Sequence, residues 1–363
     1  IAIAHRAGIP AHNFLVADRT GSIGWTIAGK LPDRVGFDGR LPVSWSFGDR
    51  RWNGFLPSAA VPTLVSPQLD RIWTANNRLV GGASLARIGD GGYASPPRAR
   101  QVRDALARLK NVTAGELQAI QLDDRAIFLT RWQKLLLAAL TPDAVKQKKS
   151  RAELRRLVEN WDPRASVTSV GYRLVRSFRT VTTELVLAPI FAPCVESMPA
   201  FNWHQFNYEP ALWALLRDRP AHLLNPSFAS WNELVLAAAD EVVTALEKEG
   251  VPLQRATWGE RNRARIQHPF GRIVPAIGRW LDLPPDPLAG DVNMPRVQSP
   301  SFGASMRLVV SPGHEEEGLF EMPGGESGHP LSPYYRAGHE AWVKGNPSPL
   351  LPGEAIHTLT LAP

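Results

Sequence analysis

The sequence predicts an α+β protein, because its two ends are patterned as β-strands and its middle is patterned as α-helices. In residues 1–92, short β-branched and aromatic runs alternate with Gly- and Pro-rich turns, which is typical of strands. From about Ser95 the apolar residues recur with a period near 3.6, which is typical of helices. After about Pro284 the chain returns to loops with short strand-like segments. We therefore predict a sheet-rich region over 1–92, a mainly helical region over 93–290, and C-terminal strands and loops over 291–363 that return to the same sheet system.

The composition is that of a folded protein. The chain has 363 residues, of which 44% are hydrophobic and 21% are charged, and this length suits two domains or one large one. Cys194 is its single cysteine, so neither an internal disulfide nor a thiolate metal cluster is expected. The compartment stays open on this evidence, because a reduced cytosol and a cysteine-poor periplasm both fit.

Five segments have the composition of β-strands. The first two flank Asp18-Arg-Thr-Gly21, a polar link ending in glycine that suits a hairpin. The third is β-branched and aromatic and ends in two asparagines, and the last two flank a Ser-Pro-Gly turn. The predicted strands span residues 14–17, 23–27, 71–76, 306–310 and 319–322.

Helix-start signals mark the middle of the chain. Each places a side-chain acceptor or a negative charge where a helix leaves backbone N–H groups unpaired. The predicted starts are Ser95 before two prolines, the capping boxes Thr113/Glu116 and Ser150/Glu153, and the pair Asp123 and Asp124 ahead of a helix that includes Ile127 to Leu136. Further helical patterns span residues 172–187, 210–216 and 231–249.

No membrane span is expected. The longest uncharged apolar stretch near residues 185–195 is broken by Pro189 and Pro193 and is too short to cross a bilayer. Residues 1–14 contain His5 and Arg6 and no apolar core, so they are not a signal peptide. We expect the mature N-terminus to lie upstream of Ile1.

Positive charge is concentrated in the helical region. Residues 98–180 carry 18 Lys and Arg against 8 Asp and Glu, a local excess of 10 that exceeds the whole-chain excess of 7. A basic face can bind nucleic acid or anionic substrates. The alternative is an ordinary solvated helix face, which we favour for the basic residues Lys146, Lys148, Lys149, Arg151, Arg155 and Arg156. Neither nucleic acid nor membrane is therefore predicted as a partner.

The remaining histidines and acidic clusters do not form a recognised metal motif. His314 with Glu315, Glu316 and Glu317 crowds ligand types together, but consecutive residues in a turn point in different directions, which favours a solvated turn. His329 and His339 lack zinc-binding spacing and are interpreted as hydrogen-bonded structural histidines. No phosphate loop or Gly-x-Ser-x-Gly elbow is present.

Asn76 belongs to the most specific short motif, Trp73-Thr-Ala-Asn-Asn-Arg78. A side-chain amide at a strand end can aim its NH₂ group at a developing oxyanion, and it has no proton to lose. Taken alone, paired asparagines after a strand are also common turn formers. Both interpretations remain open on the residues themselves.

With this motif and six others, the sequence resembles the penicillin acylase family of N-terminal-nucleophile hydrolases, particularly the branch with N-acyl-homoserine-lactone acylases. The seven motifs are collinear and span almost the whole chain. They are residues 13–18, 21–25, 53–57, 74–78, 121–125, 257–262 and 323–330.

The resemblance implies an αββα sandwich with a large helical layer inserted between strand regions. It implies a precursor that cleaves itself into a small and a large chain, in which a serine becomes residue one of the large chain and uses its own α-amine as general base. Ile1 is not that serine. The resemblance therefore implies that the nucleophile, the rest of the large chain and the small chain lie upstream, and that residues 1–363 alone are inactive.

The resemblance also assigns candidate site residues. Asn76 corresponds to the oxyanion-hole asparagine. Arg100 is the first candidate for an arginine that supports the active site, with Arg98 and Gln101 as alternatives. His12 falls at an acyl-pocket position, and Asp90 is the one candidate ligand for a structural calcium ion, with a plain turn residue as its alternative. No cofactor is implied for catalysis.

The leading hypothesis is hydrolysis of a small-molecule linear amide, such as the acyl side chain of a penicillin or an N-acyl-homoserine lactone, in the periplasm or outside the cell. The competing hypothesis is a non-catalytic binding module that uses the basic helical face on an anionic polymer, whose binding would depend strongly on salt. Independent catalysis by this chain would need another nucleophile, and none is found.

Overall fold

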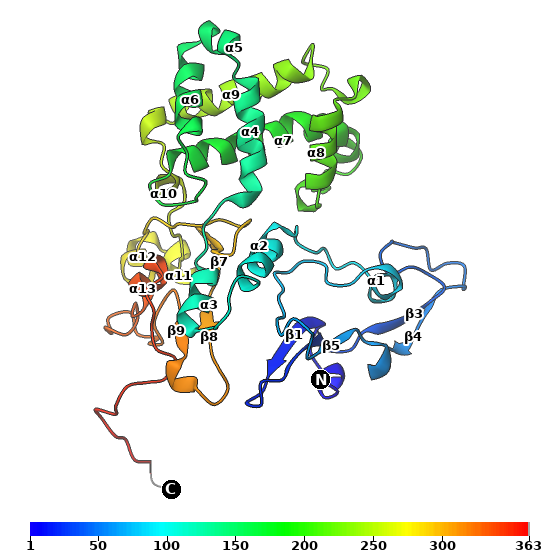
Figure 1. The fold of residues 1–363 in the computed structure, drawn as a ribbon, viewed down its shortest axis with the longest axis vertical. Helices are drawn as coiled ribbons and strands as arrows, with labels where there is room; N and C mark the ends of the chain where they lie inside the picture. The colour runs from blue at the N-terminus through cyan, green and yellow to red at the C-terminus, as the bar shows by residue number, and fades with distance from the viewer. Residues whose placement is uncertain (362–363) are drawn as a thin grey trace. The chain divides into compact units, whose positions relative to one another are not determined.

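The structure is a computed structural model that describes residues 1–361, and it confirms a mixture of helices and strands (Figure 1). The chain divides into two compact units built from discontinuous segments. Unit 1 comprises Ile1–Ala107, Ala126–Pro163 and Val170–Ala256. Unit 2 comprises Arg108–Arg125, Arg164–Ser169 and the chain from Thr257 on. These two units are defined by contacts in three dimensions. The three predicted regions were defined by residue patterns along the sequence, so their boundaries differ.

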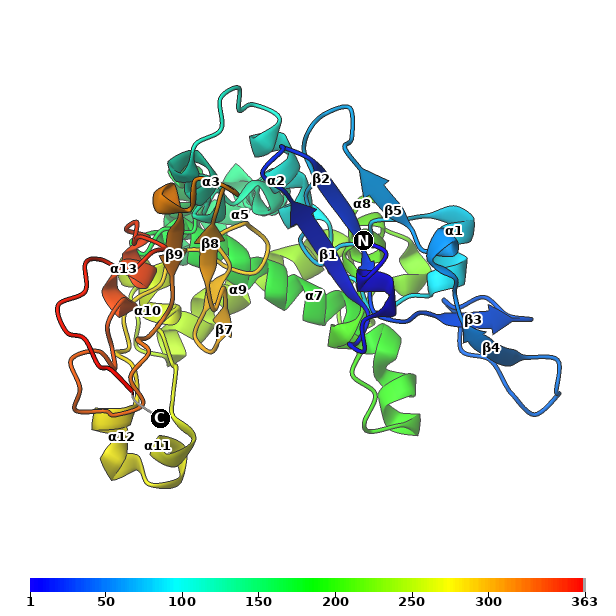
Figure 2. The same cartoon turned by 90° about the horizontal axis from the view of Figure 1, so that it is seen from below.

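The first sheet of unit 1 begins with the predicted hairpin. β1 (His12–Ala17) pairs antiparallel with β2 (Ile23–Ala28), which pairs with β5 (Thr63–Val65), so the order is β1-β2-β5 (Figure 2). The Asp18 carboxylate closes the turn by accepting from the backbone N–H of Thr20 at 2.8 Å. A left-handed φ of 85° at Gly21 completes the turn, a conformation that glycine adopts without steric cost.

The predicted strand over 71–76 is wrong. Those residues are irregular, and the third strand of the sheet is β5 instead. Asp70 and Asn76 have positive φ values of 48° and 62°, and these left-handed residues at each end prevent a continuous extended segment. Composition favoured a strand, but the backbone bends at Asp70 and again at Asn76.

A small apolar core supports this sheet. Trp25, Ile27, Leu31 and Val61 are buried together, and residues such as Ile72 pack against them. A second sheet pairs β3 (Pro32–Val35) with β4 (Arg51–Phe55). The remaining short elements here are α1 (Gly82–Ile88) and the 3₁₀ turns η1 (Ala4–Arg6) and η2 (Ser58–Ala60).

The helical layer of unit 1 is built around α7. This helix packs against α4, α6, α8 and α9, and Trp132 and Phe178 meet edge to face in its core with ring centroids 6.2 Å apart. Helix α7 approaches Trp161 closely at Gly171, where a Cβ atom would overlap the indole side chain. The helices are α2 (Pro97–Leu106), α4 (Thr130–Ala139), α5 (Pro142–Gln147), α6 (Lys149–Glu159), α7 (Val170–Ser197), α8 (Glu209–Asp218) and α9 (Trp231–Lys248), with 3₁₀ turns η3 (Ile127–Leu129), η4 (Trp203–Gln205), η5 (Ala221–Leu223) and η6 (Leu253–Arg255).

The predictions of residues 172–187, 210–216 and 231–249 as helical are confirmed by α7, α8 and α9. By length and composition, α7 is also the one helix within residues 1–361 that could cross a membrane, with a window of mean hydropathy 1.3. The first half of α7 is buried in the helical layer, including Leu174 and Phe178. Core helices meet the same criterion, so the expected absence of a membrane span stays a prediction.

Of the predicted helix starts, only the Thr113 capping box is confirmed. The Thr113 hydroxyl accepts from Glu116 N–H and the Glu116 carboxylate accepts from Thr113 N–H, at the start of α3 (Ala114–Gln121). Ser95 is not a cap, because its hydroxyl donates to Asn207 instead. Ser150 lies inside α6, which begins one residue earlier.

Asp123 and Asp124 also do not begin a helix. Their carboxylates pair with Arg125 and Arg164, and α4 starts later, at Thr130. Asp124 is buried. Its negative charge is compensated by Arg164 rather than by the dipole of a helix.

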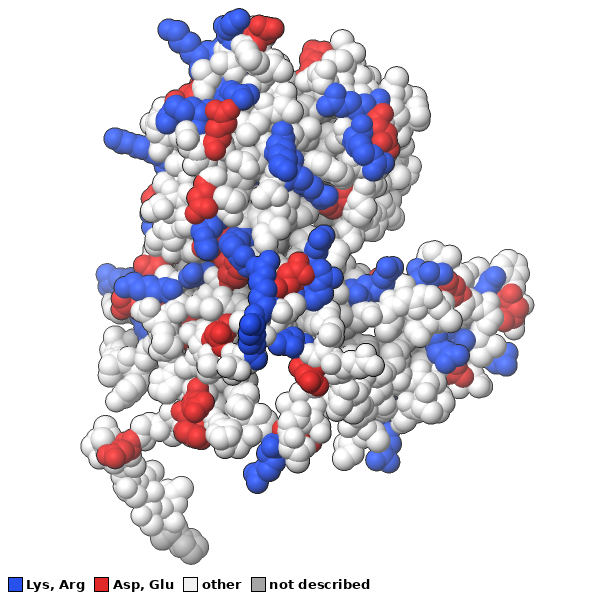
Figure 3. All heavy atoms as spheres, in the orientation of Figure 1, with Lys and Arg blue, Asp and Glu red and all other residues white. Residues whose placement is uncertain are grey.

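The basic face proposed on α5 and α6 is largely neutralised. Arg151 is buried rather than solvated and shares the Asp240 carboxylate with Lys148 at 2.7 and 2.6 Å. Arg155 and Arg156 pair with Glu159 and Glu153 within the same helix. Figure 3 shows Lys and Arg side chains beside Asp and Glu over this layer. The pairing leaves little surplus charge for an anionic polymer.

Unit 2 contains two small hairpins, and the predicted strands over 306–310 and 319–322 are confirmed as its larger one. Among residues 1–361 they form a two-stranded sheet of their own. The expected return of these strands to the N-terminal sheet system stays a prediction. The elements of unit 2 are α3, β6 (Gln298–Ser299), β7 (Phe302–Gly303), β8 (Arg307–Val309), β9 (Leu319–Glu321), α10 (Trp258–Arg261), α11 (Pro269–Ile273), α12 (Pro275–Leu281), α13 (His339–Lys344) and the 3₁₀ turn η7 (Glu315–Glu317).

A buried ion pair holds the larger hairpin together. The Arg307 guanidinium on β8 donates to the Glu321 carboxylate on β9 at 2.5 Å, and both side chains are at most 3% exposed. Gln118 from α3 donates to the same carboxylate. His339 is buried and hydrogen-bonds the Pro323 carbonyl at 2.7 Å, which confirms its interpretation as a structural histidine.

Candidate functional site

Asn76 lies on a loop that is held by hydrogen bonds on both sides of the residue. Its φ of 62° is left-handed, a conformation that asparagine tolerates better than most residues. Its carbonyl accepts from Ala94 N–H at 2.8 Å. The neighbouring Asn77 side chain accepts from Ala75 N–H at 3.1 Å and donates to the Arg78 carbonyl at 2.9 Å. These hydrogen bonds therefore fix the backbone of the loop at Asn76.

Arg98 determines which way the Asn76 amide faces. Its guanidinium donates to Asn76 Oδ1 at 2.7 Å and to the Ala75 carbonyl at 2.8 Å. A guanidinium has only donors, so the amide atom that it contacts is the oxygen. The Nδ2 group then faces away from Arg98, and no described residue accepts a hydrogen bond from it. The arrangement presents an exposed NH₂ donor that cannot lose a proton.

The environment of Arg98 is unusual for an arginine. It lies in the first turn of α2 and is partly buried, and it pairs with no carboxylate among residues 1–361. Burial lowers the pKa of the Arg98 guanidinium below its usual value, although an arginine remains charged at neutral pH. A cation on Oδ1 polarises the amide and strengthens Nδ2 as a donor.

The structure separates the three candidates for the supporting arginine position. Arg98 contacts Asn76, whereas Arg100 is 75% exposed and lies 3.8 Å from Asp104 on the same helix. Gln101 is buried within α2. Of these three residues, only Arg98 bonds Asn76 in the structure, although sequence reasoning placed Arg100 first.

His12 and Asp90 are not joined to Asn76 by any hydrogen bond or ion pair in the described part of the chain. His12 is the exposed first residue of β1, and its Nδ1 bonds the Pro10 carbonyl at 2.7 Å. Asp90 is exposed, and one of its oxygens accepts from Gly92 N–H at 2.9 Å. Both therefore have local structural partners, and their proposed roles stay predictions.

Asp90 alone does not fit a calcium site. Calcium requires about six to eight oxygen ligands, and Asp90 does not belong to any described group of three or more potential ligands. The one such group within residues 1–361 is His314, Glu316 and Glu317. These three are exposed in and beside η7, in line with the solvated turn predicted there.

Comparison with known proteins decides the family. Residues 1–355 match the family described as penicillin amidase. The chain belongs to this family. It is 28% identical over 348 residues to the penicillin acylase 2 proenzyme of Pseudomonas sp. (strain SE83) and 24% identical over 376 residues to the acyl-homoserine lactone acylase QuiP of Pseudomonas aeruginosa. Each alignment covers 92% of this chain and 43% of the relative.

The fold is also that of a solved family member. The thermostable penicillin G acylase of Alcaligenes faecalis superposes with a TM-score of 0.60 at 17% identity, covering 99% of this chain and 69% of that chain. At 43% coverage of each of the two relatives named above, the chain spans less than half of their length. The penicillin amidase family and its fold are shown, and the expected resemblance is confirmed.

Proposed function

We propose that this chain is the oxyanion-stabilising part of a penicillin amidase family amidohydrolase that cleaves a linear amide through an acyl-serine intermediate. The observation that carries the proposal is the fixed Asn76 amide, whose oxygen is held by Arg98 and whose NH₂ group is left to donate. The substrate class rests on the relatives, which are named as penicillin and acyl-homoserine lactone acylases. We expect this enzyme to prefer one of these two kinds of substrate.

In the proposed reaction, a serine hydroxyl attacks the amide carbonyl and the carbonyl oxygen gains negative charge. Asn76 Nδ2 donates to that oxygen, and Arg98 keeps the amide from rotating as the charge develops. A preorganised donor of this kind stabilises the transition state more than the ground state, because the oxygen is charged only there. Collapse expels the amine, and water then hydrolyses the acyl-serine.

The nucleophile is proposed to lie upstream of residue 1, in a small-chain and large-chain assembly made from one precursor. To test this, the complete protein is labelled with a sulfonyl fluoride and the modified peptide is mapped by mass spectrometry. We expect one modified serine outside residues 1–363, with loss of amidase activity in proportion to labelling. A stoichiometric label inside residues 1–363 that abolishes activity would overturn the upstream assignment.

A second prediction concerns Arg98 as a positioning residue. Arg98→Ala frees the Asn76 amide to rotate, so kcat for amide hydrolysis should fall about 10-fold to 100-fold with a smaller change in KM. Arg98→Lys should recover part of the loss, because an ammonium can still donate to Oδ1. The matched control is Arg103→Ala on the same helix, whose guanidinium bonds Asp104 instead. Equal losses in the Arg98 and Arg103 variants would show that only helix stability is affected.

The remaining family-based expectations are also proposals. They are a periplasmic or extracellular location, processing by self-cleavage, inactivity of residues 1–363 on their own, and a structural calcium ion whose other ligands would come from outside the described residues. The competing binding-module hypothesis gains no support from the basic helices, because most of their cations are paired.

A further inference from the structure

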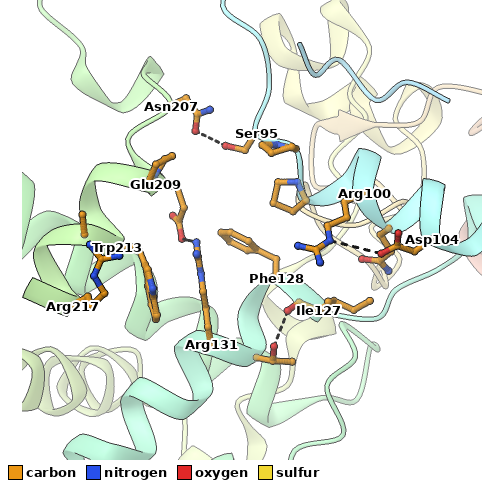
Figure 4. A pocket seen from close by; sticks show the side chains of 16 residues that line it. Ser95, Arg100, Asp104, Ile127, Phe128, Arg131, Asn207, Glu209, Trp213 and Arg217 are labelled. Carbon is orange, nitrogen blue, oxygen red and sulfur yellow. Dashed lines mark hydrogen bonds and ion pairs between the residues drawn. The ribbon is translucent and has the colours of Figure 1, made fainter. Parts of the chain in front are cut away.

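A cavity in unit 1 is lined by residues next to Arg98 in the chain and is not used by the proposed reaction. It has a volume of about 560 Å³, which is within the range of small-molecule pockets. Residues from α2, η3, α4 and α8 line it, and Figure 4 shows Arg100 reaching in from one side and Arg131 from the other. The Ser95 hydroxyl closes part of the rim by donating to Asn207 Oδ1 at 2.6 Å.

The cavity offers cations whose charge is incompletely compensated. Arg131, which lines the cavity, shares the Glu209 carboxylate with Arg179, which lies outside the lining, so this partly buried cluster has one surplus positive charge. The Nε atom of Arg131 is buried and has no hydrogen-bond partner. Among the lining residues, the three arginines Arg100, Arg131 and Arg217 outnumber the two acids Asp104 and Glu209, so the lining carries a net charge of +1.

Arg100 is the cation with the most free donors at the edge. Asp104 accepts its hydrogen bonds from Arg103, at 2.8 and 2.7 Å, and Arg100 approaches Asp104 only to 3.8 Å. No described residue accepts a hydrogen bond from the Arg100 guanidinium. Its guanidinium can therefore bind a carboxylate without breaking an existing hydrogen bond.

Much of the remaining wall is apolar, beside the polar residues Gln101 and Thr130 and the acids Asp104 and Glu209. Phe128 and Trp213 lie on either side of the Arg131 guanidinium, with ring centroids 5.0 and 4.5 Å away (Figure 4). Pro96, Pro97 and Ile127 add to the apolar part of the lining, and Ile127 is 52% exposed at the surface. A ligand for this cavity combines an apolar or aromatic body with one negative charge.

We propose that this cavity, defined by Arg100, Ile127, Phe128, Arg131 and Trp213, binds a small amphipathic monocarboxylate. The carboxylate pairs with Arg100 and its apolar body packs on Ile127 and Phe128. Neither Asn76 nor Arg98 lines the cavity, so the site is separate from the Asn76 donor. The proposal does not rest on the proposed amidase reaction.

Calorimetric titration of the complete protein with 4-phenylbutanoate tests the proposal, with 4-phenylbutan-1-ol as the neutral probe of the same shape. We expect saturable binding of the carboxylate and at least about tenfold weaker binding of the alcohol. Ile127→Asp places a negative charge at the exposed wall and should weaken carboxylate binding about tenfold or more. Ile127→Asn, of the same size without the charge, should weaken it much less.

Arg100→Gln should weaken carboxylate binding about tenfold and leave alcohol binding within about twofold. The matched control is Arg108→Gln, an exposed arginine just beyond α2 that does not line the cavity. Carboxylate binding that is absent, or that is equal in the wild type, Ile127→Asp and Arg100→Gln, overturns the proposal. Equal binding in all three proteins would show that the probe binds at another site, such as an acyl pocket.

Asn76→Ala keeps the two claims distinguishable. The protein with this substitution should bind 4-phenylbutanoate like the wild type, whatever its amidase activity. Loss of amide turnover with intact probe binding supports both claims, whereas loss of probe binding in this variant contradicts the separation of the two sites.

Discussion

Asn76→Ala in the complete protein is expected to lower amide turnover about 10²-fold to 10³-fold while precursor processing and folding survive. The physical reason is the loss of the Nδ2 donor that Arg98 orients at 2.7 Å through Oδ1. A donor that acts only on the charged oxygen of the transition state should affect kcat far more than KM. Steady-state kinetics on a linear amide, with electrophoresis of the processed chains, measures both.

The backbone of Asn76 requires a matched control. Its φ of 62° strains an alanine by roughly 1 kcal/mol or more, whereas glycine adopts this conformation freely. Asn76→Gly removes the same donor without the strain, so its turnover should fall as far as that of Asn76→Ala. Asn77→Ala changes the neighbouring amide, which bonds only the loop itself, and should cost much less. Wild-type turnover in Asn76→Gly would remove Asn76 from the oxyanion hole.

Local patterns predicted the elements whose stability is itself local. The hairpin around Asp18 and the capping box of Thr113 depend on contacts within a few residues, and both are confirmed. The predicted strand over 71–76 failed because composition does not reveal the left-handed residues at its ends. The prediction of Ser150 as a cap failed because α6 begins one residue earlier, at Lys149, which places Ser150 inside the helix.

The site was predicted in part, because its key contact is not local. Asn76 was named from its motif, but the Arg98 bond spans 22 residues. Choosing among Arg98, Arg100 and Gln101 requires the phase of α2, and successive helical residues point about 100° apart. A sequence pattern does not fix that phase to one residue at a helix start.

Glu209 carried no signal in the sequence, because all its partners are distant along the chain. Its carboxylate accepts from Arg131, from Trp132 Nε1 at 2.9 Å and from Arg179 at 2.7 Å, across separations of 78, 77 and 30 residues. These partners lie on α4 and α7, so Glu209, at the first residue of α8, ties three helices together. Its side chain is only 9% exposed.

Glu209→Ala should therefore destabilise the helical layer by about 3 kcal/mol. Removing one partner of a buried ion pair leaves an uncompensated charge, which typically costs about 3–5 kcal/mol, and the lower end applies because Arg131 is 36% exposed. The matched control, Asp218→Ala, removes an exposed acid at the other end of α8, whose one ion pair within residues 1–361 is with the adjacent Arg217. Its effect should stay within about 0.5 kcal/mol. Equilibrium denaturation in urea, followed by far-UV circular dichroism, measures the free energy of unfolding of each variant.

A double substitution separates uncompensated charge from lost packing at Glu209. If the cost comes from the two guanidiniums left without a carboxylate, replacing Arg179 with Met in the Glu209→Ala background should recover part of the lost stability. If the cost comes from the small cavity that alanine leaves, the second substitution should add a further loss. Equal stability of Glu209→Ala and Asp218→Ala would instead show that the Glu209 cluster contributes no more than an ordinary surface ion pair, despite its burial.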